Sequence, residues 1–470
     1  MSKHFNIVII GAGPGGYVAA LKAGQMGASV AIIEKNKVGG TCLNVGCIPS
    51  KALLASAHLL HQIYRAGEFG VQVSGEPTFD WTKIQSRKDR VIRMLQNGVK
   101  SLFTARKVEH IAGEGKIASP GIVTVSTTKG VEEITCDNII LAVGSRPAVI
   151  PSWPDDRDVI CTSDEALHWK TLPRDLLIVG GGIIGCEFAC MMQAFGVKVT
   201  VVELMPRILP ELDEHLAEEM TKIFAKRGIK CLVGTKVEDM KLGANGVEAT
   251  LSGEVSVNAD RVLVAVGRRP ATEGVGLENV NITTDRGFVR VDDGMRTPTK
   301  GVYCIGDANG RCLLAHAASA QGVVAVENIM GHNATYDAPI PSCVYTFPEI
   351  AGVGMTQKQA KEQGIPISVG AFPIGYLGKA MAAGETEGFM KVIRHRHSDQ
   401  LLGVHMIGHN VTECNAAAGA MLHQKVSVRE LVQVVIAHPT ISEALREATE
   451  DALGMALHLP PRKVVRMSAQ

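Results

Sequence analysis

The chain is 470 residues long, about three times the ~150 residues of a typical domain, so two to four domains with a substantial core are expected and a single small module is excluded. Lys and Arg number 48 and Asp and Glu number 47, and a formal net charge of +1 provides no basic field for phosphate backbones, so we predict no nucleic-acid partner. Hydrophobic residues make up 46% of the chain, but charged positions interrupt every apolar stretch before the ~18 to 20 residues that a membrane-spanning helix needs, which predicts no membrane association.

The first apolar run begins at Phe5 and leaves no room for the charged and apolar segments of a secretion signal. The 11 cysteines include no CxxC pair, which argues against a structural zinc site and against the disulfide framework of a secreted protein. We therefore expect a cytoplasmic protein without a metal site.

The N-terminal segment carries the order strand, glycine turn, helix and strand. The apolar run 5–10 (FNIVII) predicts a buried parallel strand and leads into the glycine turn 11–16 (GAGPGG). A helical stretch over 17–26 and a second strand over 29–33 follow, and Glu34 comes directly after that strand. This order is the fingerprint of a Rossmann dinucleotide-binding fold.

Each glycine of the fingerprint has its own physical reason. Gly11 permits the tight turn, Gly13 lets the backbone approach a pyrophosphate, and Gly16 allows close packing of helix on strand. The helix N-terminus offers free N–H groups to the anion, and Glu34 can accept a hydrogen bond from a ribose hydroxyl. The sequence therefore predicts a nucleotide site at this turn.

A cysteine pair, Cys42 and Cys47, precedes a helical run over 52–60. In a reducing compartment two cysteines this close are more often redox-active or metal-binding than structural. Zinc would need four ligands, and no second pair or His cluster has ligand spacing, which favours a disulfide that opens and closes. Two unpaired buried cysteines are the alternative.

The Rossmann pattern recurs in the middle of the chain. A strand over 176–179 leads into the glycine turn 180–185 (GGGIIG), a helix to about Phe195 follows, and a strand over 197–202 ends at Glu203. The separation between the first glycine and the acid is the same in both copies. The predicted second nucleotide turn consists of Gly180, Gly182 and Gly185.

Glu203 also bears on the choice of nicotinamide nucleotide. A carboxylate at this position accepts from a free 2′-hydroxyl but repels the 2′-phosphate of NADP, so NAD is favoured. The alternative is that Glu203 is a solvated acid and Arg207 is available for a phosphate.

Near the C-terminus, His438 and Pro439 begin the segment HPTISE, which leads into a helical pattern over 444–457. Proline disfavours the α conformation for His438, Ser442 is a candidate N-cap, and Glu443 falls in the first helical turn. A histidine beside a carboxylate can take a proton from a thiol. A structural His-Pro turn is the alternative.

At residues 39–51 (GGTCLNVGCIPSK) and 438–443 (HPTISE) the sequence resembles the class I pyridine nucleotide-disulfide oxidoreductases, and the likeness covers essentially the whole chain. The resemblance implies an α/β fold with two Rossmann-like dinucleotide-binding domains, for FAD and NAD, and a C-terminal α/β dimerisation domain. The implied FAD domain consists of residues 1–150 and 271–340, and it encloses the implied NAD domain over residues 151–270. The implied dimerisation domain covers residues 341–470.

The resemblance also assigns roles to single residues. Lys51 is implied near the flavin and paired with Glu187, a solvated helix-start lysine being the alternative. Asp307 of the segment GVYCIGD is implied to bond the ribityl chain of FAD, and Gly113 to meet its nucleotide. The remaining implied cofactor contacts and domain crossings are Gly144, Ser145, Gly267, Leu313, Leu314, Ala315 and His316.

By resemblance, protein-bound dihydrolipoyl groups are reoxidised through a Cys42/Cys47 disulfide and FAD, and a hydride passes to NAD. His438, oriented by Glu443, is implied to act as the base and to come from the partner subunit of a homodimer. The implied partner is a lipoyl-bearing acyltransferase or a lipoyl carrier protein of a multienzyme complex. Residues 372–415 depart from the family pattern and leave that complex unspecified.

Two other readings stay open. Glutathione-type reductases share the cysteine loop, but they use NADP and carry basic residues where this chain has Glu203 and Leu209. A flavin-bearing interaction subunit of a larger assembly would associate tightly with its partner but turn over negligibly alone.

Overall fold

A computed structural model of the chain describes residues 3–243 and 246–460. They form two compact units, each built from two stretches of chain. Unit 1 comprises residues 1–173 and 261–337, and unit 2 comprises residues 174–260 and 338–470. The predicted α/β class is confirmed, and the four predicted domain segments stay a prediction.

Unit 1 is built on a seven-stranded sheet with the order β3-β2-β1-β6-β5-β4, in which β19 also pairs with β6. Its parallel strands are β1 (Lys3–Ile10), β2 (Val30–Glu34), β3 (Val108–Ala112), β6 (Gly130–Leu141) and β19 (Val302–Cys304). The hairpin of β4 (Glu114–Ser119) and β5 (Ile122–Thr127) joins β6 antiparallel.

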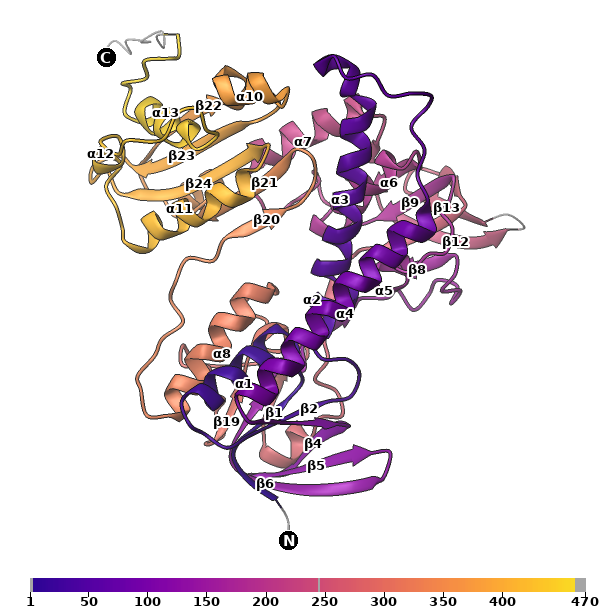
Figure 1. The fold of residues 1–470 in the computed structure, drawn as a ribbon, viewed down its shortest axis with the longest axis vertical. Helices are drawn as coiled ribbons and strands as arrows, with labels where there is room; N and C mark the ends of the chain where they lie inside the picture. Colours follow the sequence, from indigo (N-terminus) through magenta and orange to yellow (C-terminus); the bar gives the residue numbers. More distant parts are fainter. Residues whose placement is uncertain (1–2, 244–245, 461–470) are drawn as a thin grey trace. The chain divides into compact units, whose positions relative to one another are not determined.

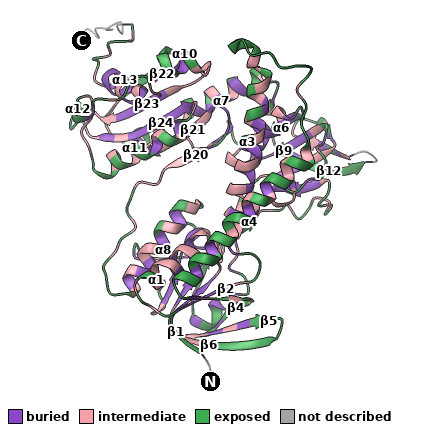
Figure 2. Ribbon diagram, in the orientation of Figure 1, coloured by how far each residue is buried: buried purple, intermediate pink, exposed green. Residues whose placement is uncertain are grey.

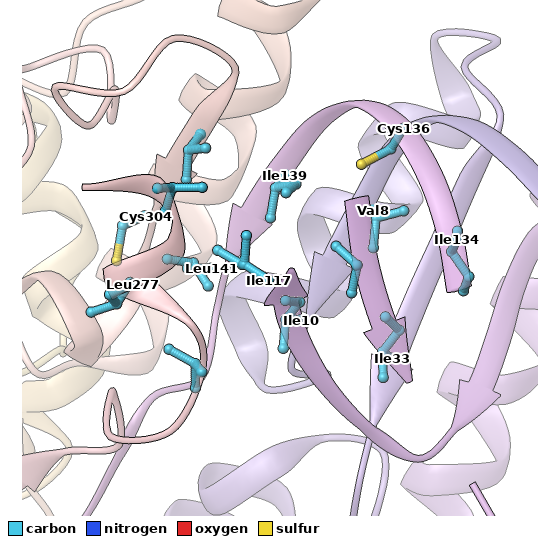
Figure 3. Packing of buried hydrophobic residues seen from close by; sticks show 14 of the residues in the cluster. Val8, Ile10, Ile33, Ile117, Ile134, Cys136, Ile139, Leu141, Leu277 and Cys304 are labelled. Carbon is cyan, nitrogen blue, oxygen red and sulfur yellow. The ribbon is translucent and has the colours of Figure 1, made fainter. Parts of the chain in front are cut away.

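The central strand β1 is buried on both faces, as expected for a parallel strand between two layers. Val8 and Ile10 belong to one hydrophobic cluster, whereas Ile7 and Ile9 belong to another. Figure 3 shows the first cluster, where Ile139 and Leu141 of β6 lie near Cys304. Helices α1 (Pro14–Gln25) and α8 (Ala315–Ile329) pack together in unit 1.

Two long helices, α3 (Cys47–Tyr64) and α4 (Trp81–Ala105), also belong to unit 1 and are prominent in Figure 1. Asp80 caps α4 by accepting from Lys83 N at 3.0 Å. Much of α4 is exposed, as the green parts of its ribbon in Figure 2 show. The short helix α2 (Gly40–Val45) precedes α3 and carries Cys42.

In unit 2 the second Rossmann pattern forms the parallel strands β9 (Asp175–Val179), β10 (Lys198–Val202) and β11 (Lys230–Leu232). Helix α6 (Ile183–Ala194) joins β9 to β10, and α7 (Glu214–Lys226) precedes β11. The hairpin strands β12 (Val237–Gly243), β13 (Gly246–Leu251) and β14 (Val255–Ala259) form a separate antiparallel sheet.

The C-terminal part of unit 2 is a five-stranded antiparallel sheet with the order β20-β21-β24-β23-β22. Its strands are β20 (Ser342–Val344), β21 (Glu349–Gly354), β24 (Leu401–Gly408), β23 (Phe389–His395) and β22 (Ile367–Pro373). Helices α11 (Val411–His423) and α13 (Glu443–Ala452) pack on this sheet. We call residues 338–460 the C-terminal sheet module.

Helix boundaries differ most from prediction around the cysteine pair and at the C-terminus. The helix predicted over 52–60 begins at Cys47, and the helix predicted over 444–457 ends at Ala452. Ser442 occupies the N-cap position of α13 but makes no side-chain cap hydrogen bond. Its hydroxyl lies 3.6 Å from the sulfur of Cys414 instead.

Among the described residues, no helix is long and apolar enough to cross a membrane. Within the same part of the chain, no group of three or more His, Cys, Asp or Glu side chains is arranged to hold a metal ion.

Candidate active site

The first glycine turn lies between β1 and α1 and tolerates no side chain at two positions. Gly11 has φ +104°, and a Cβ there would lie 2.3 Å from the carbonyl oxygen of Ala142. A Cβ on Gly16 would lie 1.9 Å from Gly11 O. Gly13 is the N-cap of α1 and makes no side-chain cap hydrogen bond. This turn therefore suits the close approach of a phosphate to the helix N-terminus.

Glu34, at the end of β2, reaches back to that turn. Its two carboxylate oxygens accept from Ala12 N at 2.8 Å and from Asn36 N at 2.7 Å. Each oxygen keeps a further acceptor position, which suits a ribose hydroxyl. Gly113 lies beside it, since Gly113 N donates to Glu34 O at 3.0 Å.

The second glycine turn, in unit 2, repeats this geometry. Gly180 has φ +108°, and a Cβ on Gly185 would lie 1.9 Å from Gly180 O. Glu203 is buried and accepts from Gly181 N and from Met205 N, both at 2.7 Å. Gly182, the N-cap of α6, makes no side-chain cap hydrogen bond.

The structure also bears on the alternative that Arg207 binds a phosphate, because Arg207 has another partner. The guanidinium of Arg207 pairs with the carboxylate of Glu214 at 3.1 Å. The positive charge is thereby offset, and the carboxylate of Glu203 faces the glycine turn. This arrangement favours the ribose hydroxyls of NAD over a 2′-phosphate.

Asp307, the predicted ribityl contact, belongs to a hydrogen-bonded group in unit 1. The hydroxyl of Ser145 donates to Asp307. The guanidinium of Arg268 donates to Ser145 Oγ at 2.7 Å and to Ser145 O at 2.8 Å, and it lies 3.9 Å from the Asp307 carboxylate. Arg268 was not among the predicted site residues, although it stands directly after Gly267 in the segment VGRRP.

Two short strands that follow glycines pair with each other beside this hydrogen-bonded group. Gly144 and Gly267 both have positive φ, +69° and +111°, and the strands that follow them, β7 (Ser145–Pro147) and β16 (Arg268–Pro270), pair antiparallel. This pairing brings Arg268 to Ser145, which a linear reading of the sequence does not reveal. The predicted contacts Leu313, Leu314, Ala315 and His316 lie at the start of α8, with Leu314 as its N-cap.

Cys42 and Cys47 lie close together, on α2 and at the first residue of α3. Gly46 allows this approach, because a Cβ there would lie 3.3 Å from Cys42 Cα. The hydrogen bond with Cys47, burial and the charge of Cys47 raise the pKa of the Cys42 thiol, while the charge of Lys51 lowers it. Cys47 is the first residue of α3, and a hydrogen bond from its backbone also acts to lower the pKa of the Cys42 thiol.

His438 and Glu443 form a pair in unit 2. His438 Nδ1 lies 2.9 Å from one Glu443 oxygen, and the other oxygen accepts from Thr440 N at 2.8 Å. Burial acts to raise the pKa of the Glu443 carboxyl, but the hydrogen bonds from Thr440 and His438 outweigh it and lower that pKa. The His438 side chain is 75% exposed, so its Nε2 can face a substrate thiol.

Several predicted site residues lie in different units. Lys51 belongs to unit 1, whereas Glu187 and His438 belong to unit 2. Glu187 is buried on α6, and its carboxylate accepts from Tyr345 N at 3.0 Å. The pairing of Lys51 with Glu187 stays a prediction.

Comparison with known proteins places this geometry in context. Residues 5–322 match the model of the pyridine nucleotide-disulphide oxidoreductases, and residues 340–449 match the dimerisation domain of the same family. The chain is 41% identical to the dihydrolipoyl dehydrogenase of Bacillus subtilis over 97% of its own length and 100% of that protein. It is 38% identical to the dihydrolipoyl dehydrogenase of Chlamydia muridarum over 98% and 100%.

Solved structures show the same likeness. LpdA from Mycobacterium tuberculosis superposes with a TM-score of 0.89 at 27% sequence identity, over 95% of this chain and 99% of that one. The HOCl-induced flavoprotein disulfide reductase RclA from Escherichia coli superposes with a TM-score of 0.85 at 26% identity, over 95% and 99%. The predicted fold is therefore shared along nearly the whole chain.

Proposed function

Because this chain belongs to the pyridine nucleotide-disulphide oxidoreductase family, it is an NAD-dependent flavoprotein oxidoreductase that acts on sulfur, and we propose that it oxidises dihydrolipoyl groups carried by a partner protein. The observation that carries this proposal is the close pair of Cys42 and Cys47 in a chain that also holds two Rossmann turns. Full-length likeness to dihydrolipoyl dehydrogenases supports the substrate class.

The residues present fit both nucleotides. The first turn, with Glu34 on a backbone N–H of the turn and Asp307 held by Ser145, suits FAD. The second turn, with Glu203 on Gly181 N, suits NAD. When bound, the flavin supplies a two-electron relay between the cysteine pair and the nicotinamide.

The cysteine pair carries the sulfur chemistry. In the oxidised enzyme, a thiolate of the dithiol substrate attacks the Cys42 sulfur, and the bond from Cys42 to Cys47 breaks. The second substrate thiolate then displaces Cys42, which releases the cyclic substrate disulfide. Two electrons remain on the cysteine pair, and the two protons leave the substrate thiols. Cys47, the leaving sulfur of the first exchange, is left as a thiolate.

His438 handles the protons of these exchanges. A neutral imidazole takes a proton from a substrate thiol through Nε2, while Glu443 holds Nδ1 and stabilises the imidazolium that forms. The second exchange returns a proton to Cys42, whose raised pKa favours the thiol. We assign His438 in each active site to the partner subunit of a homodimer, in keeping with the dimerisation domain match over residues 340–449.

The test is the absorbance of NADH after purified yellow protein is mixed with NAD and dihydrolipoamide, with NADP in a parallel sample. Rapid formation of NADH in the sample with NAD, and no reduction in the sample with NADP, is the expected result, because Glu203 disfavours a 2′-phosphate. No turnover with either nucleotide, in protein that retains its flavin, would contradict the dehydrogenase proposal and favour another disulfide substrate. Turnover only when a lipoyl-bearing partner is added would favour the interaction subunit.

A further inference from the structure

Lys391 of β23 is a buried lysine distant in sequence from every predicted site residue of the second Rossmann fold. Its side chain is 1% exposed, and its ammonium donates to both carboxylate oxygens of Asp213, at 2.8 and 2.9 Å. The ammonium also lies 3.1 Å from His215 Nδ1. A buried ion pair adds little net stability, because desolvation offsets the attraction, but it restricts its two elements to one geometry.

Asp213 belongs to the Rossmann fold, so this pair joins that fold to the C-terminal sheet module within unit 2. Asp213 is the N-cap of α7, where its carboxylate accepts from His215 N at 3.3 Å, and it also accepts from Gln357 N at 3.3 Å. Burial acts to raise the pKa of the Asp213 carboxyl, but the hydrogen bond and charge of Lys391 outweigh it and lower that pKa. The carboxylate therefore stays charged and fixes the first residue of α7.

The segment between Glu203, the acid of the proposed NAD site, and Asp213 contacts the second glycine turn at its middle. Leu209 N donates to Gly181 O at 2.7 Å, and Leu212 N donates to Leu209 O at 3.0 Å. Leu209 is buried and has φ +48°, a conformation that costs energy for a leucine and persists only where the surroundings hold it. We call residues 204–212 the nucleotide-site loop.

The nucleotide-site loop packs directly on the turn. A Cβ on Gly181 would lie 2.9 Å from Ile208 Cγ2 and 3.1 Å from Glu203 Cβ. There is no spare space between these three residues, so a shift of the loop would displace Gly181 N from the Glu203 carboxylate. The nucleotide-site loop thus connects the ion pair of Lys391 and Asp213 to the atoms that face the adenosine ribose in the proposed NAD site.

We propose that Lys391 is a positioning residue for NAD: through Asp213 it holds the nucleotide-site loop against Gly181, and so keeps Glu203 aligned for the ribose. The inference rests on the proposed function, because it takes the second Rossmann turn as the NAD site. It predicts that a residue of the C-terminal sheet module governs nucleotide affinity without touching the nucleotide.

The test variant is the double substitution Asp213→Asn with Lys391→Met, which removes both charges together and keeps an oxygen to cap α7. In the flavin-loaded protein, the KM for NAD should rise by at least about fivefold, the scale seen when a coupled contact is removed. At saturating NAD the kcat should stay near wild type, because the nucleotide-site loop contacts only the adenosine side of the nucleotide. The rate of flavin reduction by dihydrolipoamide without NAD should also stay near wild type, because that half-reaction does not use the NAD site.

The matched control is Arg227→Met at the other end of the same helix. Arg227 is the C-cap residue of α7 and pairs with Glu387 of the C-terminal sheet module at 2.9 Å. This variant loosens α7 from the same module without reaching the nucleotide-site loop, so its KM for NAD should stay near wild type. An equal rise in the KM for NAD in both variants would overturn the proposal, because it would show that any loosening of α7 from the module has this effect.

Amide hydrogen exchange can be measured on the wild-type protein, so this test does not depend on whether a variant folds. In the wild-type protein, NAD should slow exchange at residues 180–185 and also at residues 204–212. Protection of the turn without protection of the nucleotide-site loop would overturn this inference and leave the proposed function intact. No protection of the turn, together with no NADH formation, would overturn the proposed function instead.

Discussion

Cys42 and Cys47 have the same side chain but different backbone surroundings. Cys47 is the first residue of α3, whereas Cys42 lies within α2. The pKa of the Cys42 thiol is raised by the hydrogen bond with Cys47, by burial and by the charge of Cys47, and it is lowered by the charge of Lys51 and by a hydrogen bond from the Cys47 backbone. The raising effects win, which favours the protonated thiol at Cys42 after the proposed exchange.

Replacing Cys42 by serine should separate the two half-reactions. Flavin reduction by dihydrolipoamide should fall to below about one thousandth of the wild-type rate, because Cys47 alone cannot form the disulfide that the substrate thiolate attacks. Flavin reduction by NADH should persist, since it does not require this sulfur. Stopped-flow absorbance of the flavin measures both rates, and undiminished reduction by the dithiol would contradict the role of Cys42.

Replacing Glu443 by glutamine should lower kcat for dihydrolipoamide about 100-fold, because an amide does not stabilise the imidazolium of His438. The control is Glu447→Gln on the same helix, where the carboxylate pairs with His458 at 2.8 Å rather than with His438. Steady-state assays of both variants measure the difference. Equal losses in the two variants would indicate a structural role for these carboxylates.

His405 gives unit 2 a pH-dependent stability. Burial lowers the pKa of this imidazole below its ordinary value, and its Nε2 lies 2.9 Å from Met355 O. The folded state therefore binds fewer protons than the unfolded state once the pH falls below about 6.5, and stability is lost as the pH falls further. Between pH 7.5 and 5.5 the urea midpoint should fall more for wild type than for His405→Gln, and equal falls would exclude this contribution.

At the scale of elements, the two Rossmann turns are near copies because both satisfy the same steric requirement. In each, the third glycine of the turn lies against the carbonyl of the first, with a notional Cβ only 1.9 Å from that oxygen. In each, an acid at the end of the next strand accepts from a backbone N–H of the turn. Sequence spacing alone therefore predicted both glycine turns, since local backbone geometry determines them.

Matched substitutions at the two turns should remove the two nucleotides separately. Gly16→Ala should yield protein that loses its flavin, whereas Gly185→Ala should stay yellow but bind NADH weakly, because the added methyl must displace the turn. Flavin absorbance after gel filtration and an NADH fluorescence titration measure these outcomes. Loss of flavin from Gly185→Ala would contradict the assignment of FAD to the first turn.

The helices were predicted less well than the turns. The helix predicted over 52–60 extends over Cys47–Tyr64, because Gly46 ends α2 and lets α3 begin at the second cysteine. Residues 47–51 (CIPSK) include Pro49 and are too few to show helical periodicity, and only the folded chain shows that the helix includes them. This boundary makes Cys47 the first residue of α3.

At the scale of the whole molecule, each unit combines chain segments far apart in sequence. The Rossmann fold of residues 174–260 and the C-terminal sheet module form one unit and share the buried pair of Asp213 and Lys391. The predicted division follows the sequence order of the family pattern, and it stays a prediction. The contacts that join the two parts of unit 2 come from residues far apart in the sequence.

Mixed dimers test the assignment of His438 to the partner subunit. A purified heterodimer of one Cys42→Ser subunit and one His438→Gln subunit keeps one complete site if each site spans the dimer, so it should retain about half of the wild-type activity. Each homodimeric variant should be nearly inactive with dihydrolipoamide. A nearly inactive heterodimer would show instead that both residues act within one subunit.

The sequence by itself determined the α/β class, both nucleotide turns, the cysteine pair and the His438 and Glu443 pair, because short stretches of backbone and side chain carry these features. Cys42 and Cys47 are only five residues apart, and the local geometry of α2, Gly46 and α3 brings them close together. Only the tertiary structure brought Arg268 to Ser145 and Lys391 to Asp213, since these contacts depend on which strands pair and which modules pack. Long-range contacts of this kind leave no local pattern, because nothing in the neighbouring residues specifies the distant partner.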